Sequence, residues 1–100
     1  MRLKEGVIIK GAQPELVLGL MIVQEIFRKN QLELTITSAL DGHHMEGSLH
    51  KMGLAVDIRI RDIAPELRSV VLTEMKVCLG RDFDVVLEDD HIHFEVQPKG

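Results

Sequence analysis

The sequence contains no tryptophan, no tyrosine and only three phenylalanines in 100 residues, so its core must consist of aliphatic side chains and methionine. It contains a single cysteine, Cys78, which excludes an intramolecular disulfide and gives no sign of an oxidising compartment. Cys78 falls in an apolar helical pattern, and we expect it to be buried as a small hydrophobic side chain. The 45% hydrophobic content is typical of a globular chain, and the length predicts one domain spanning residues 1–100.

Basic residues are too scattered for a nucleic-acid-binding surface, since 12 Lys and Arg oppose 16 Asp and Glu and the net charge is −4. Long apolar runs are also missing. The longest, from Leu16 to Val23, is too short to span a bilayer, so membrane insertion is not expected. Residues 1–5 are charged and do not resemble a signal peptide. We therefore expect synthesis in the cytoplasm, with release by lysis or a phage route if the substrate lies outside.

The spacing of apolar residues predicts two helices. Pro14 suits the first position of a helix, and apolar residues then recur at helical spacing up to residue 29. A second helix begins near Pro65 and ends at Gly80. Alternating or β-branched runs predict a short strand or extended arm over 7–9 and strands over 32–38, 54–61, 83–88 and 91–96. This order indicates an α+β fold in which a small antiparallel sheet has two helices packed on one face and leaves the other face open.

Two of these strands, 54–61 and 91–96, alternate apolar with polar side chains. If the apolar sets face the helices, the polar sets converge on the open face of one sheet. The residues placed there are Asp57, Arg59, His91, His93 and Glu95. In a two-residue hairpin turn formed by Asp89 and Asp90, Glu88 pairs across from His91 and shares that face.

Histidine and carboxylate side chains are ligand types of catalytic zinc, and the sequence indicates that His50, Asp57 and His93 hold one metal ion. His50 lies just before the strand that carries Asp57 and reaches the same edge. The ordinary alternative is a solvated polar face without metal, but aspartate is disfavoured in strands and usually needs a reason to be there. His43 and His44, in a long loop before this motif, are either further ligands or substrate contacts, or have neither role.

The pattern Ser48-Leu-His50-x-x-Gly53-x-Ala55-x-Asp57, followed by His91-x-His93, resembles the zinc D-Ala-D-Ala metallopeptidases. That family includes D-Ala-D-Ala carboxypeptidases and dipeptidases, phage endolysins of the L-alanyl-D-glutamate type and the related hedgehog signalling domain. The motif is specific, and the resemblance covers the second half of the chain. It implies a hedgehog-like zinc site on the open face, with one Zn²⁺ per chain held by His50, Asp57 and His93 and a fourth position open for water.

By this resemblance the chain is a zinc metallopeptidase that hydrolyses a peptide bond in the stem peptide of peptidoglycan, as a DD-carboxypeptidase or a murein endopeptidase. Its small size fits a minimal catalytic module of phage or prophage origin. The family's catalytic carboxylate, which takes a proton from the metal-bound water, falls on Asp90 in the dipeptidase-like pattern and near Glu88 in the hedgehog-like one. Strand parity ranks Glu88 first. His91 supports a ligand or stabilises the oxyanion, Ser48 contacts substrate or braces its loop, and Glu95 supports a ligand or is solvated.

The chain departs from the family pattern in one place. Many members carry an arginine after a Thr-Ser pair that helps bind the substrate's carboxylate, whereas this sequence continues as Ser38-Ala-Leu-Asp41. His44, Arg59 or Arg61 would have to replace it, which weakens the case for a carboxypeptidase and leaves an endopeptidase open. The alternative function is a non-catalytic zinc-binding or protein-interaction domain of the same fold.

Overall fold

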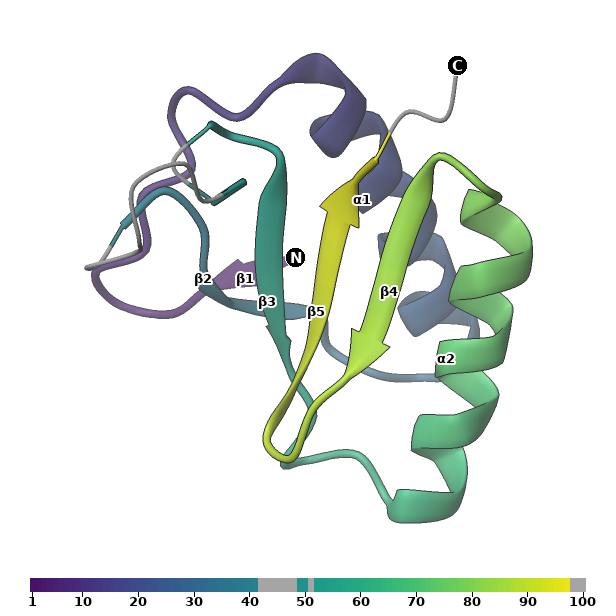
Figure 1. The fold of residues 1–100 in the computed structure, drawn as a ribbon. Helices are drawn as coiled ribbons and strands as arrows, with labels where there is room; N and C mark the ends of the chain where they lie inside the picture. The colour runs from purple at the N-terminus through teal and green to yellow at the C-terminus, as the bar shows by residue number, and fades with distance from the viewer. Residues whose placement is uncertain (42–48, 51, 98–100) are drawn as a thin grey trace.

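The structure of the chain is a computed structural model that describes residues 1–41, 49–50 and 52–97. Five strands form one sheet in the order β1-β2-β3-β5-β4, and two helices pack on one of its faces (Figure 1). The elements are β1 (Arg2–Leu3), α1 (Pro14–Lys29), β2 (Thr35–Ser38), β3 (Ala55–Arg59), α2 (Pro65–Leu79), β4 (Phe83–Leu87) and β5 (His91–Val96). The α+β class with two helices is therefore confirmed. Neither helix is long and apolar enough to cross a membrane in the ranges that the structure describes.

The sheet is mixed rather than wholly antiparallel as predicted. β1 runs parallel to β2, whereas the β2–β3, β3–β5 and β5–β4 pairs are antiparallel. Residues 7–9 form the extended arm and not the strand. A turn diverts the chain there, with Gly6 at φ +89° and the N–H of Val7 donating to the carbonyl of Lys4 at 3.1 Å. The apolar arm then packs beside the core without joining the sheet.

Helix α1 has the predicted bounds. Pro14 lies in its first turn, and the positive charge of Arg28 in the last turn interacts favourably with the negative end of the helix dipole. The helix ends in a Schellman motif, in which the N–H of Leu32 donates to the carbonyl of Phe27 at 2.9 Å and that of Gln31 to Arg28 at 3.0 Å. Gln31 has a φ of +60°, a left-handed conformation that favours glycine.

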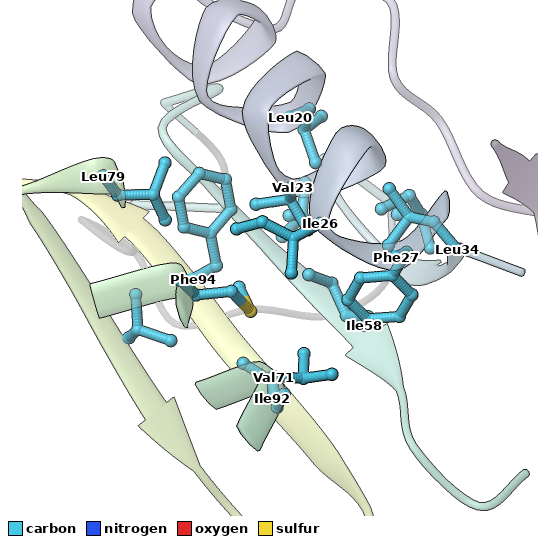
Figure 2. Packing of buried hydrophobic residues seen from close by; sticks show 14 of the residues in the cluster. Leu20, Val23, Ile26, Phe27, Leu34, Ile58, Val71, Leu79, Ile92 and Phe94 are labelled. Atoms are coloured by element: carbon cyan, nitrogen blue, oxygen red, sulfur yellow. The ribbon is translucent and has the colours of Figure 1, made fainter. Parts of the chain in front are cut away.

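The core lies between the helices and one face of the sheet. Figure 2 shows Val23, Ile26 and Phe27 of α1 gathered with Ile58 of β3 and Phe94 of β5, and all five are buried. Full burial of such a side chain stabilises the fold by about 1.5–3 kcal/mol. The apolar sets of β3 and β5 thus face the helices as predicted, which turns the polar sets of both strands to the opposite face.

Cys78 is exposed, so the prediction that it is buried is wrong. The buried row of α2 consists of Val71, Met75 and Leu79, each four residues after the last. Leu79 rather than Cys78 completes this row against the core. The helical turn therefore directs the thiol outward.

Candidate metal centre

The polar sets of β3 and β5 meet on the open face of the sheet, as strand alternation predicts. The antiparallel register places Asp57 directly opposite His93 and Arg59 opposite His91. Side chains at directly opposite positions lie close enough to interact. All four are half-buried, so the site is partly shielded from solvent but open on one side.

His50 reaches the same site from a turn that precedes β3. The N–H of Leu54 donates to the carbonyl of Leu49 at 2.9 Å, and that of Gly53 to the carbonyl of His50 at 3.1 Å, which is the bonding pattern of a Schellman turn. Gly53 has a φ of +75°, and a Cβ atom there would collide with the backbone of Gly11. Only glycine fits this turn, which leaves the His50 side chain 8% exposed.

Ligand atoms of His50, Asp57 and His93 all lie within 4.8 Å of one another, so these residues could hold a metal ion. Asp57 Oδ1 is 3.4 Å from His50 Nε2 and 2.9 Å from His93 Nδ1. A tetrahedral zinc ion with bonds of about 2.0–2.1 Å separates its ligand atoms by about 3.3 Å. The three residues are therefore near the separation that such an ion requires. In the described part of the chain this is the one group of its kind.

The hydrogen bond of His50 also fits a metal ligand. Its Nδ1 lies 3.0 Å from the carbonyl oxygen of Ala39, which can only accept, so Nδ1 carries the hydrogen. In the neutral ring, Nε2 then presents its lone pair toward the carboxylate of Asp57. Two acceptor atoms facing each other at 3.4 Å are arranged to share a cation. A backbone carbonyl behind a ligating histidine is a usual way to fix its tautomer.

The charges of the site depend on these contacts. Burial alone raises the pKa of Asp57, but hydrogen bonds from His50 and His93, formed when those rings are protonated at the nitrogens that face it, outweigh burial and hold that pKa well below its usual range. The pKa of His93 is raised, first by its hydrogen bond to Asp57 and further by one to Glu95, against an opposing effect of burial. Without metal, the surrounding carboxylates thus favour the charged form of the His93 imidazole.

Of the hairpin residues predicted to be catalytic, Asp90 contacts His91 through its side chain, whereas Glu88 contacts it through the backbone. His91 Nδ1 lies 2.6 Å from Asp90 Oδ1, and its Nε2 lies 3.6 Å from Asp57 Oδ1. Glu88 pairs with His91 through the backbone, where its N–H donates to the His91 carbonyl at 2.8 Å, and its side chain is exposed. Strand parity predicts this pairing correctly. The side-chain contact to His91, however, comes from Asp90 in the turn.

The predicted substrate contacts are only partly visible. Ser48 and His44 lie outside the described residues, as does His43. Arg59 lines a hollow of about 250 Å³ together with Thr35, Asp62 and five others, none of which belongs to the metal group.

Two contributors to the site were not assigned from the sequence. Glu95 Oε1 lies 2.6 Å from His93 Nε2, whereas sequence reasoning left Glu95 equally open to solvation. Its position two residues after His93 on the same face was the available signal. The Ala39 carbonyl carried no signal, because it is a backbone atom eleven residues from His50.

No protein-family model matches this sequence, and no curated protein sequence matches it significantly. The function is therefore argued from the site geometry and from the sequence motif that it contains.

Proposed function

We propose that this chain is a zinc-dependent peptidase that hydrolyses a peptide bond in the stem peptide of peptidoglycan. The observation that carries the proposal is the group formed by His50, Asp57 and His93, whose ligand atoms lie within 4.8 Å of one another. Two imidazoles and one carboxylate form a donor set typical of catalytic zinc, with the fourth position left for water or substrate. The substrate class comes from the resemblance of the Ser48–Asp57 motif to the D-Ala-D-Ala metallopeptidases.

Zinc is favoured because imidazole nitrogens suit it, whereas magnesium and calcium prefer all-oxygen sites. When bound, zinc supplies a polarised peptide carbonyl and a bound water whose pKa falls toward about 7. Neither helix covers the face of the sheet that carries these ligands (Figure 1). Residues around the ligands would then accept and donate the protons that are transferred during hydrolysis.

His91 is placed to hold a proton at the site. The carboxylate of Asp90 accepts from Nδ1, at 2.6 Å, so the opposite nitrogen, Nε2, faces Asp57 and the metal position. An imidazole held in this orientation can take up a proton at Nε2 and, once protonated there, donate to the developing oxyanion or deliver that proton to the leaving amine. The Asp90 carboxylate orients the His91 ring through this hydrogen bond.

The contact with His91 favours Asp90 over Glu88 as the catalytic carboxylate. The hydrogen bond from His91 lowers the pKa of Asp90, so this carboxylate stays ionised but is a weaker base; its case as the catalytic carboxylate rests on the 2.6 Å contact with His91. If Asp90 is the base, Asp90→Asn should lower kcat/KM by about 10²–10⁴-fold, while Glu88→Gln should have a far smaller effect. The reverse order would assign the base to Glu88.

The test is digestion of purified murein by the protein with added zinc, followed by mass spectrometry of the new termini. The wild-type protein should bind one zinc per chain and release peptide fragments, and His50→Ala should abolish both. Wild-type protein that takes up no zinc at saturating concentration would sink the proposal. Stoichiometric zinc without turnover of any stem peptide would instead support the non-catalytic zinc-binding domain.

A further inference from the structure

We infer that Glu95 and Gln97 are positioning residues of the metal centre, with Glu95 fixing His93 as a ligand through Nδ1 and Gln97 holding Glu95 in place. This inference rests on the metal site of the proposed function and not on its peptidase activity. It concerns which nitrogen of His93 meets the ion and how firmly the ring is held.

The three side chains form a ladder along the open face at the end of β5. Strand alternation places His93 and Glu95 on the same side of β5, and Gln97, the residue after the strand, contacts Glu95. Glu95 Oε1 lies 2.6 Å from His93 Nε2, and the Gln97 amide donates to Glu95 Oε2. Both oxygens of one carboxylate are thus engaged. The Glu95 side chain is 17% exposed, so water competes little for these bonds.

The contact with Glu95 favours one tautomer of His93 once a cation lies at Nδ1. Both ring nitrogens face carboxylate oxygens, which accept and cannot donate; when a cation takes the place of the hydrogen at Nδ1, the neutral ring keeps its hydrogen on Nε2, where Glu95 accepts it. Nδ1 is the nitrogen that faces Asp57 Oδ1, at 2.9 Å. His50 has the opposite arrangement, because the Ala39 carbonyl takes its Nδ1 hydrogen and leaves Nε2 for the metal. Each histidine therefore has its own partner that aims a different nitrogen at the same point.

The sheet also provides space for this arrangement. Ala55 is directly opposite Glu95 in the β3–β5 register and is fully buried. Its methyl group is small enough for the Glu95 side chain to lie beside the strand and reach His93. Ala55 and Glu95 are thus matched in size across the two strands. A glutamate that was simply solvated would not need a small residue opposite it.

The experiment measures the dissociation constant for zinc by competition with a chromophoric chelator, using the full chain purified without metal. Glu95→Ala should raise the dissociation constant about 10–100-fold, the usual effect of removing a group behind a ligand. Glu95→Gln keeps an accepting oxygen but loses the charge, so the dissociation constant should rise less than in Glu95→Ala. Gln97→Ala should also raise it less than Glu95→Ala does. Asp89→Asn, which removes an exposed carboxylate from the nearby hairpin turn, is the control and should change affinity less than twofold.

A second measurement separates positioning from general stability. In the long-range ¹H–¹⁵N spectrum of the zinc-loaded wild-type protein, His93 should carry its hydrogen on Nε2. Circular dichroism checks that each variant folds, and Glu95→Gln, which keeps the shape of the side chain, answers the question if Glu95→Ala does not fold.

Zinc affinity of the Glu95 variants within twofold of wild type would overturn the inference, as would a hydrogen on His93 Nδ1 in the loaded protein. Either result would leave the peptidase proposal standing. A weakened zinc site in the Glu95 variants with no peptidase activity in the wild type would support the inference and refute the proposed function. A wild-type protein that binds no zinc would refute both.

Discussion

Replacement of Gly53 by alanine tests whether the turn that carries His50 is as constrained as the structure indicates. Gly53 has a φ of +75°, in the left-handed region that alanine adopts at a cost of about 1 kcal/mol. A Cβ atom added there would overlap the carbonyl oxygen of Gly11 and lie 3.1 Å from Ala12 Cα and 3.2 Å from Gln13 N. These are backbone atoms, which cannot move aside as a flexible side chain does.

The expected loss of stability is therefore the sum of two effects. The conformational cost is about 1 kcal/mol, and crowding of a packed site adds about 1–3 kcal/mol, for a total of about 2–4 kcal/mol. For a chain of this length each kcal/mol lowers Tm by roughly 4–8 °C. Gly53→Ala should thus lower Tm by at least about 8 °C, measured by circular dichroism on the metal-free protein.

Gly6 provides the matched control. It has a φ of +89°, but an added Cβ would meet no atom within 4 Å. Gly6→Ala should therefore show only the conformational cost, a drop in Tm of roughly 4–8 °C. Equal losses for the two variants would refute the argument that the Gly11 backbone excludes a side chain at Gly53.

The same substitution should also weaken the metal site. The N–H of Gly53 donates to the carbonyl of His50, and its own carbonyl accepts from Gln13 at 2.8 Å. Any shift that relieves the collision moves His50 relative to β3. Zinc affinity should fall more than tenfold in Gly53→Ala, since ligand atoms have to stay within a few tenths of an ångström of their positions. Gly6→Ala should bind zinc as the wild type does.

Three further predictions follow from single features. Gln31→Gly should stabilise the chain by about 1 kcal/mol, seen as a higher urea midpoint, because it relieves a left-handed φ of +60°; an unchanged midpoint would count against this. Gly19→Ala should destabilise the chain by about 1 kcal/mol in the same assay, because the added Cβ would lie 2.6 Å from Phe94 and 2.7 Å from Phe83. This crowding should outweigh the roughly 1 kcal/mol by which alanine stabilises a helix relative to glycine. A stabilised variant would show that the two rings can move aside. In metal-free protein, the contribution of His93 to stability should be complete below about pH 6.5 and lost as pH rises through its raised pKa, and thermal unfolding from pH 5 to 9 measures this; His93→Gln should flatten the dependence.

Much of the site was predictable because strands alternate strictly. The period of two placed Asp57 and His93 on one face without reference to any other protein, and the register puts them directly opposite. The α1 boundaries followed similarly from Pro14 and the apolar spacing. Such local rules fix which side of an element a residue occupies.

Local rules do not fix contacts made through side-chain rotamers or by distant backbone. Parity placed Glu88 on the open face, but the group that reaches His91 is Asp90, a turn residue whose direction no alternation describes. The tautomer of His50 depends on the Ala39 carbonyl, and β1 joins β2 in parallel through only two residues. These features require the folded chain, since they arise where segments far apart in sequence meet.

The metal-free and metal-bound forms of this site are two ways of balancing the same negative charge. Asp57 and Glu95 are both half-buried and both contact His93, and its raised pKa favours a ring proton that offsets their charge when no ion is bound. A zinc ion has to displace that proton from Nδ1, while the hydrogen on Nε2 stays with Glu95. Zinc affinity should therefore increase as pH rises through the raised pKa of His93, the range in which the metal-free protein loses the stability that protonated His93 contributes. As pH rises, the stability of the metal-free protein should fall while its affinity for zinc increases. An ordinary surface ion pair would show only the first trend, because no metal ion competes there with the proton on the histidine.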